Sequence, residues 1–213
     1  MSRMRNDEAV IDEWIKGGEA FVFYREPGER VCHGIRAARS SLQSFEVFPS
    51  NDGKTGFVFA PFRFGEGHPL WLLPLEEEIE VGISRAVCSD EVEAPAPMPF
   101  CGRLEEQPSK EYREAFRAFS GALRAGDFQK LVLSRGCTDA FPHGFSWARA
   151  FTAACRRYVH SYVYLFHTPQ TGFWLGATPE ILLAGGKGEY RTVALAGTQF
   201  LQEGKLTTPW SEK

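Results

Sequence analysis

The spacing of hydrophobic and polar positions predicts one helix and several short strands in the first 75 residues. Asn6 is suited to cap a helix that carries Val10, Ile11, Trp14 and Ile15 on one face and that ends at Gly17-Gly18. Four β-like runs follow, with a turn of Glu26-Pro27-Gly28-Glu29 between the first two: residues 20–24, 31–35, 56–62 and 70–75. This part of the chain is therefore predicted to form a sheet-rich layer.

The alternation stops at Glu76, where the sequence becomes acidic and then rich in proline up to Pro108. Such composition favours an extended segment that crosses between two structural parts. We therefore divide the chain into a sheet-rich portion over residues 1–90, a crossing segment over 91–108 and a second region over 109–213.

The second region mixes helical and strand periods. Ser109 can cap a helix that ends at Gly126, and a strand over Phe128–Arg135 follows. The apolar stripe of the first helix is Tyr112, Phe116, Phe119 and Leu123, and that of a second capped helix is Trp147, Phe151, Ala154 and Tyr158.

The last part of the second region reads as strands joined by turns. Residues 162–166 and 173–175 are strand-like around a turn at 168–172, and Gly185–Gly188 forms another turn. Helix, strand, helix and several strands together predict a mixed α/β or α+β domain.

Composition narrows the functional classes. The chain has 213 residues, 43% of them hydrophobic and 24% charged, with a formal net charge of −3, which is typical of a globular protein. The sequence has no basic run, no apolar stretch of membrane-spanning length and no signal-peptide core, so we expect neither nucleic-acid nor membrane partners and a cytoplasmic location. The five cysteines are scattered without a C-x-x-C pair, which favours reduced, structural thiols.

The motifs that most often mark an active site are missing. The sequence contains no glycine-rich phosphate loop, no G-x-S-x-G elbow and no H-E-x-x-H pair. Its five histidines lack ligand spacing, so structural histidines are favoured over a metal site.

Lys130 is the first residue that can carry chemistry. Strand alternation places it on the face of Phe128 and Val132. A lysine there either protects a strand edge from aggregation or, if its face is buried, serves as a general base.

Glu180 is the second. It follows Thr178-Pro179, a common opening of a helical turn, in which the carboxylate caps backbone N–H groups. The short apolar run Ile181-Leu182-Leu183 suggests the alternative, a protonated general acid in an apolar pocket.

Ala196-Gly197-Thr198 is the third. It is either a plain turn or a place where glycine lets exposed N–H groups and a hydroxyl hold a substrate carboxylate.

Taken in order, Phe128–Arg135, Leu175–Leu183 and Leu195–Thr198, followed by Ser211-Glu212-Lys213, resemble the chorismate-utilising enzymes. This family includes isochorismate synthase, salicylate synthase and component I of anthranilate and aminodeoxychorismate synthases. The resemblance covers the second half of the chain and implies a large domain of sheets flanked by helices around a deep substrate cleft, here apparently truncated.

Two positions sort the branches of the family. A lysine at the place of Lys130 resembles the isochorismate and salicylate synthases, which activate water, whereas the ammonia-using anthranilate synthases have glutamine there. Ala196 resembles the aminodeoxychorismate synthases less, because their motif often carries a nucleophilic lysine. The chain departs from the family at Ala194, where proline is common.

The resemblance implies an Mg²⁺-dependent isochorismate synthase that supplies quinone or siderophore precursors. Lys130 is then the general base, Glu180 the general acid, and Ala196, Gly197 and Thr198 bind chorismate. The magnesium ligands are expected beyond Lys213, so the 213 residues alone are expected to be inactive, and the intact enzyme is expected to be a monomer. The alternatives are a salicylate synthase or other chorismate-utilising enzyme, and a non-catalytic fragment or binding module.

Overall fold

The structure, a computed structural model, describes residues 7–47, 53–83, 109–134, 136, 138, 140–186, 188–193, 195, 201–202 and 205–206. It divides the chain into two compact units. Unit 1 comprises residues 1–84 and 146–213, and unit 2 comprises residues 85–145. Each unit is described by itself.

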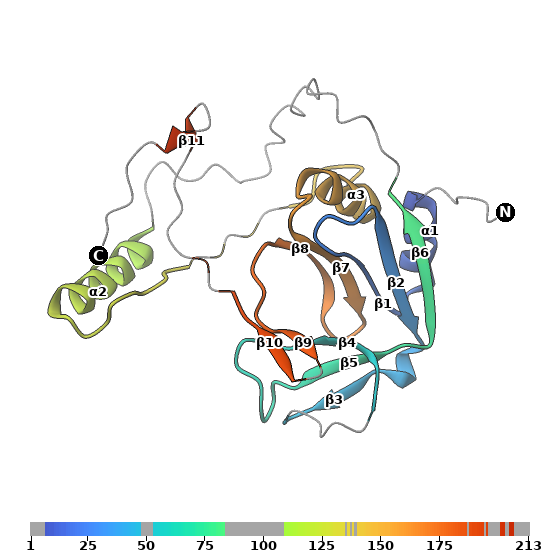
Figure 1. The fold of residues 1–213 in the computed structure, drawn as a ribbon, viewed down its shortest axis with the longest axis horizontal. Coiled ribbons are helices and arrows are strands. Elements are labelled where there is room, and N and C mark those ends of the chain that lie inside the picture. The colour runs from blue at the N-terminus through green and yellow to red at the C-terminus, as the bar shows by residue number, and fades with distance from the viewer. Residues whose placement is uncertain are drawn as a thin grey trace. The chain divides into compact units, whose positions relative to one another are not determined.

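A five-stranded antiparallel sheet forms the centre of unit 1 (Figure 1). Its central strand pairs with segments from both parts of the unit, because β1 lies between β2 and β7. In spatial order the strands are β6 (Glu77–Gly82), β2 (Val31–Ala37), β1 (Ala20–Arg25), β7 (Tyr162–Thr168) and β8 (Gly172–Thr178). The sheet therefore holds the residues before and after unit 2 in one body.

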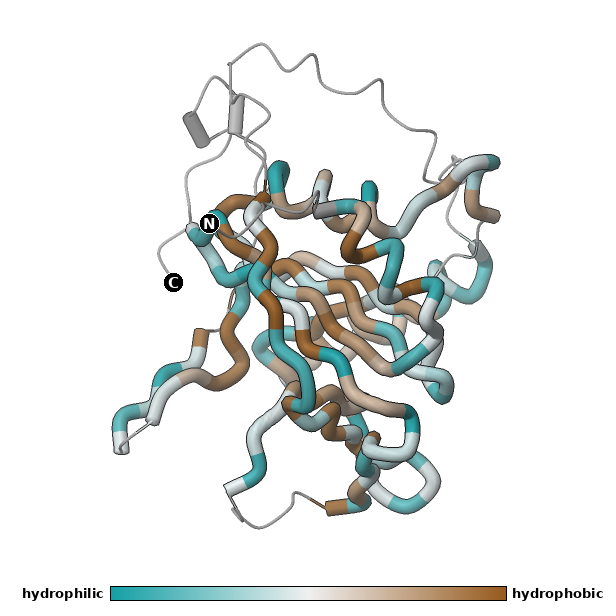
Figure 2. Tube along the Cα trace, turned by 90° about the vertical axis from the view of Figure 1, so that its right-hand side faces the viewer, coloured by the Kyte–Doolittle hydropathy of each residue, from teal (hydrophilic) through white to brown (hydrophobic). Residues whose placement is uncertain are grey.

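Both faces of this sheet are covered, which explains why β1 and β7 are apolar on both sides. Two helices, α1 (Asp7–Gly17) and α3 (Trp147–Arg157), pack on one face, over Phe21, Phe23 and Leu165. The opposite face carries Val22 and Phe166 and meets a second sheet. Figure 2 shows the hydrophobic segments concentrated along these central strands.

The second sheet has three antiparallel strands in the order β3 (Gln43–Phe45), β5 (Leu70–Pro74) and β4 (Gly56–Phe59). Leu73 of β5 is buried against Val22 and Phe166 of the first sheet. The strands predicted near residues 20, 31, 56 and 70 are thus confirmed, while the short β3 was missed.

No strand was predicted over residues 77–82, where the sequence becomes acidic. These residues form β6, which pairs with β2 along the whole length of β6. Ile79 and Val81 face the core between exposed glutamates, as one face of a strand requires. Arg36 of β2 forms an ion pair with Glu77 at 2.6 Å, so part of the acidic charge is used across this pairing.

The helices of unit 1 begin and end close to their predicted positions. Val10, Ile11 and Trp14 of α1 are buried, as the apolar stripe predicts, whereas Asn6 lies outside the described residues. In α3 the Arg149 N–H donates to the Ser146 hydroxyl at 3.2 Å, a standard N-cap. The buried side chains of α3 are Ala148, Phe151, Thr152 and Cys155.

One assignment on α3 was wrong. Tyr158 is not part of the buried stripe, because it is the C-cap residue and is half exposed. The helix ends one residue before it, so its side chain leaves the helical register.

Short hairpins complete unit 1. The first joins β9 (Ala184–Gly186) to β10 (Glu189–Arg191), which confirms the predicted glycine turn, and the second joins β11 (Leu201–Gln202) to β12 (Lys205–Leu206). Gly185 has φ +140°, and a side chain there would collide with the carbonyl oxygen of Glu189, so glycine is required for this close pairing.

Unit 2 contains α2 (Lys110–Ala125), capped by Ser109 and ended by Gly126 in the left-handed conformation, as predicted. The strand predicted over Phe128–Arg135 is wrong for residues 128–134, which are irregular. A strand needs a neighbour for its backbone groups, and the described residues of unit 2 contain none.

The fold is mixed α+β with antiparallel sheets. Among the described residues, no helix has the length and apolar character to cross a membrane.

Candidate functional site

Glu180 belongs to the Leu175–Leu183 motif and lies two residues after Thr178, where β8 ends. Its backbone N–H donates to the Thr178 hydroxyl at 3.1 Å, which fixes the turn at Thr178-Pro179-Glu180. The side chain is exposed. Among the described residues, Glu180 is thus not enclosed by the apolar pocket that one of the two interpretations places around it.

The carboxylate of Glu180 receives a hydrogen bond from a segment 15 residues further along the chain. The Leu195 N–H donates to Oε1 of Glu180 at 3.3 Å. Beside it, the Val193 N–H donates to the carbonyl oxygen of Ile181 at 2.8 Å, and the Thr192 hydroxyl donates to the same oxygen at 3.3 Å. Thr192, Val193 and Leu195 thus lie alongside residues 180–181.

The β9–β10 hairpin produces this return. It reverses the chain between Ala184 and Arg191, so that the two segments meet. Ala196, Gly197 and Thr198 lie outside the described residues, but Leu195, which contacts Glu180, directly precedes them. Two of the three sequence motifs therefore approach one another through the Glu180–Leu195 hydrogen bond.

The remaining sequence motif, which contains Lys130, belongs to unit 2. Lys130 is exposed in the irregular segment that follows α2. Its expected place on a strand face with Phe128 and Val132 is wrong, for the reason given above, and both of these side chains are exposed as well. Because Lys130 and Glu180 belong to different units, the structure describes each of them separately.

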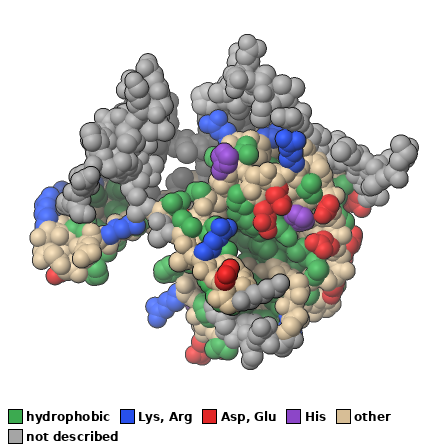
Figure 3. Space-filling view, in the orientation of Figure 1, with side chains coloured by type: hydrophobic (Ala, Val, Ile, Leu, Met, Phe, Trp, Pro, Cys, Tyr) green, Lys and Arg blue, Asp and Glu red, His purple; other side chains and the backbone are tan. Residues whose placement is uncertain are grey.

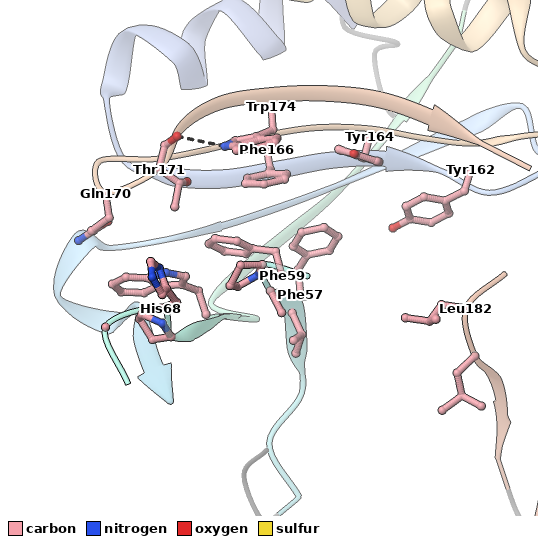
Figure 4. Close-up of a pocket in the computed structure, with 17 residues that line it drawn as sticks. Phe57, Phe59, His68, Tyr162, Tyr164, Phe166, Gln170, Thr171, Trp174 and Leu182 are labelled. Carbon is pink, nitrogen blue, oxygen red and sulfur yellow. Dashed lines mark hydrogen bonds between the residues drawn. The ribbon is translucent and has the colours of Figure 1, made fainter. Parts of the chain in front are cut away.

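A hollow of about 890 Å³ lies between the two sheets of unit 1, in the size range of small-molecule sites. In Figure 4, Phe57 and Phe59 of β4 point toward Phe166 of β7, while Leu182 stands at the opposite end from His68. The rings of Phe59 and Phe166 are 4.7 Å apart. We call this hollow the aromatic groove, and hydrophobic side chains gather around it in the space-filling view (Figure 3).

The groove is nearly devoid of charge. No Asp, Glu, Lys or Arg side chain is found among the described residues that line it, and His68 is its one titratable side chain other than tyrosines. Burial, with smaller contributions from neighbouring groups such as Tyr24, raises the pKa of the Tyr162 hydroxyl, which therefore stays neutral. The groove offers aromatic faces and few polar groups.

The groove adjoins the Glu180 segment. Leu182 and Leu183, two and three residues after Glu180, line it and are strongly exposed. Glu180 itself does not line the groove. The polar site at the end of β8 and the apolar groove are thus neighbours along the chain with opposite chemistry.

A magnesium ion was expected with this family. The described part of the chain contains no group of three or more His, Cys, Asp or Glu side chains arranged to hold a metal ion. Mg²⁺ needs several oxygen ligands in near-octahedral order, so these residues do not fit the ion.

Sequence reasoning missed the aromatic groove. Its signal was the alternation of Phe57 and Phe59 in one strand with Tyr162, Tyr164 and Phe166 in another, which places all five rings on inner faces. Which faces of the two strands meet depends on how the two sheets pack on each other, and the sequence pattern does not specify this packing.

No curated protein and no solved structure matches the chain. The model of one protein family does match it, the family described as "Chorismate binding enzyme", over residues 75–206. That span is more than half of the chain and includes Lys130, Glu180 and Ala196-Gly197-Thr198. The chain therefore belongs to the chorismate binding enzyme family.

Proposed function

We propose that this protein is an isochorismate synthase, which adds water to C2 of chorismate while the C4 hydroxyl group leaves. Membership of the chorismate binding enzyme family supports the substrate. The observation that carries the choice of branch is Lys130, since the resemblance associates a lysine at this position with water as the nucleophile and a glutamine with ammonia.

In this proposal the two proton transfers are divided between Lys130 and Glu180. Lys130 is the general base that takes a proton from the attacking water, and Glu180 is the general acid that gives a proton to the departing hydroxyl. Each such role is typically worth a factor of about 10²–10⁴ in rate. Both proton transfers act on the same substrate, so both residues are needed for turnover.

Substrate binding is assigned to Ala196, Gly197 and Thr198. The hydrogen bond between Leu195 and Glu180 supports this assignment, because it ties the residue before the motif to the proposed acid.

The aromatic groove suits chorismate poorly. Chorismate carries two carboxylates, and removing them from water without a cationic or hydrogen-bonding partner costs several kcal/mol or more. No Lys or Arg lines the groove among the described residues. This absence of positive charge argues against the groove as the place where the dianion binds.

Magnesium belongs to the proposal but not to the described residues. When bound, the ion would neutralise a substrate carboxylate and orient the ring. The described side chains do not fit it, so no step is assigned to the metal.

A salicylate synthase is the second candidate, because Lys130 fits it equally well. It would carry the reaction further and eliminate pyruvate. The two enzymes differ in their products, so analysis of the products separates them.

The proposal is tested by replacing Lys130 with methionine in the enzyme expressed from its full coding region. Methionine keeps an apolar stem of similar length and removes the base. We expect isochorismate formation to fall by a factor of about 10²–10⁴ with an unchanged melting temperature.

Lys110→Met is the matched control, because Lys110 is an exposed lysine of the same unit, and it pairs with Glu114 at 3.8 Å. Its turnover should equal that of the wild type. If Lys130→Met also turns over normally, Lys130 is not the base and the choice of branch is wrong.

A further inference from the structure

Two cysteines that are far apart in sequence meet on the helix-covered face of the sheet. Cys32 lies on β2 and Cys155 in the last turn of α3, and both are buried. Their Sγ atoms are 3.9 Å apart, although 123 positions separate them in the chain. Both thiols are reduced.

Arg25 lies beside this pair and is itself buried, with 1% of its surface exposed. Its Nη1 group donates to the Val159 carbonyl at 2.9 Å, and its Nη2 group donates to the Tyr158 carbonyl at 2.7 Å. Its Nε is buried and has no hydrogen-bond partner in the described part of the chain. A buried cation with an unused donor favours a negative charge next to it.

Cys155 is the group that can supply this charge. A hydrogen bond with Cys32 and, more weakly, the positive charge of Arg25 lower the pKa of the Cys155 thiol, against the opposing effect of burial. Reactive cysteines are typically found beside such cations, because the thiolate is the nucleophile.

We propose that Cys32 and Cys155 form a modification site, at which hydrogen peroxide oxidises the two thiols to a disulfide that links β2 to α3.

The chemistry balances in two steps. The Cys155 thiolate attacks one oxygen of the peroxide, so that an S–O bond forms, the O–O bond breaks, and hydroxide leaves and takes up a proton as water. The Cys32 sulfur then attacks Sγ of the Cys155 sulfenic acid. An S–S bond forms, the S–O bond breaks, and the Cys32 proton leaves with the hydroxyl as a second water. Two thiols and one peroxide thus give one disulfide and two waters.

The geometry suits this reagent. A disulfide bond is about 2.05 Å long, so the two sulfurs must approach by about 2 Å from their present separation, which side-chain rotation and a small shift of the last turn of α3 can supply. Peroxide is small and neutral, as entry into a buried site requires. The exposed loop residues Tyr158 and Val159, which Arg25 binds, lie directly after α3.

The bond would change the protein measurably. It would close a loop that contains all of unit 2, and closing a long loop restricts the unfolded chain. We expect the melting temperature of the oxidised protein to rise by about 5–15 °C, provided that the native geometry is kept.

The test uses the full 213-residue chain and a variant in which Cys88, Cys101 and Cys137 are replaced by serine, so that only the pair remains. Both proteins are treated in native buffer with a small excess of hydrogen peroxide, alkylated and digested without reduction. The expected result is one linked peptide pair, containing Cys32 and Cys155, with a mass two hydrogens below that of the separate peptides.

Single replacements assign the order of the two steps. Cys32→Ser should leave a sulfenic acid on Cys155, which a dimedone adduct detects, whereas Cys155→Ser should leave Cys32 unmodified under the same treatment. The reverse pattern would make Cys32 the attacking thiol and overturn the assigned mechanism.

Two outcomes would overturn the site itself: thiols that remain unreacted until denaturant is added, and an intermolecular disulfide in place of the intramolecular one. A Cys32–Cys155 disulfide that lowers the melting temperature would overturn the expected stabilisation. Because the wild type is mapped in parallel, a folding defect of the triple variant does not hide any of them.

Discussion

The face of the five-stranded sheet under α1 and α3 is filled by side chains such as Phe23 and Phe151, which are fully buried, whereas the face toward β4 and β5 keeps the aromatic groove of about 890 Å³. Beyond the groove, at the end of β8, the polar Glu180 is exposed. Side chains are thus most buried on the helix-covered face, less buried around the aromatic groove, and exposed at Glu180.

This difference in burial separates the side chains that stabilise the fold from those that are available for chemistry. Side chains on the filled face contribute hydrophobic free energy and have little room to move, so they hold the fold. The residues at the end of β8 contribute little burial and are available for chemistry. Changes on the filled face should therefore reduce stability, and changes at Glu180 should reduce turnover.

The largest effect is expected for Glu180→Gln in the enzyme expressed from its full coding region, where turnover should fall without a loss of stability. Glutamine can still accept the Leu195 hydrogen bond but cannot donate a proton as an acid. Turnover of chorismate should fall by a factor of about 10²–10⁴, with substrate affinity and melting temperature nearly unchanged. A variant that loses melting temperature and keeps its turnover would show that Glu180 is only a capping residue.

The next effect is expected for Phe151→Ala on the filled face. Phe151 is fully buried and its ring lies 6.3 Å from that of Phe23. The substitution should lower the free energy of unfolding by about 3–5 kcal/mol, measured by urea titration, because it leaves a closed cavity. If Phe151→Ala lowered the free energy of unfolding by as little as a substitution on the groove face is expected to, the proposed difference in packing between the two faces would be contradicted.

Phe166→Ala tests the groove face with the same chemistry. Phe166 packs against Phe59 but also borders the hollow, so its removal enlarges an open space and does not create a closed one. We expect a loss of about 2–3 kcal/mol, close to the transfer free energy of the ring alone. A loss equal to that of Phe151→Ala would mean that the groove is closed in solution.

The smallest effect is expected for Trp174→Ala at the groove's rim. Trp174 is 53% exposed, and its indole N–H donates to the Thr171 carbonyl at 3.0 Å. Loss of about 1 kcal/mol or less in the free energy of unfolding is expected. Tyr190→Ala, which removes another exposed ring away from the groove, is the matched control and should behave alike.

Much of the fold was predictable because local chemistry determines it. The Ser109 cap, the Gly126 stop and the apolar, strand-forming runs of β1 and β7 are each readable from a few adjacent residues. β6 was missed because its three glutamates outweighed the alternation of Ile79 and Val81. The strand over residues 128–134 was wrong because strand propensity does not supply a partner strand.

The candidate site was predictable in part. The motif positions of Lys130 and Glu180 came from the sequence, and the family match covers both. The hydrogen bond from Leu195 to Glu180 depends on the β9–β10 hairpin turning the chain back, and the contact of Cys32 with Cys155 depends on α3 packing on the five-stranded sheet. Both are long-range consequences of packing, which residue patterns alone do not specify.

The central claim is that this enzyme adds water to chorismate. The most direct measurement is to incubate the enzyme expressed from its full coding region with chorismate and Mg²⁺ in H₂¹⁸O, with and without ammonium, and to identify the products by chromatography and mass spectrometry. The account predicts isochorismate carrying one ¹⁸O atom, in equal amount with and without ammonium. An aminated product, or isochorismate without ¹⁸O, would contradict the addition of water. Salicylate with pyruvate would replace the isochorismate synthase by the second candidate.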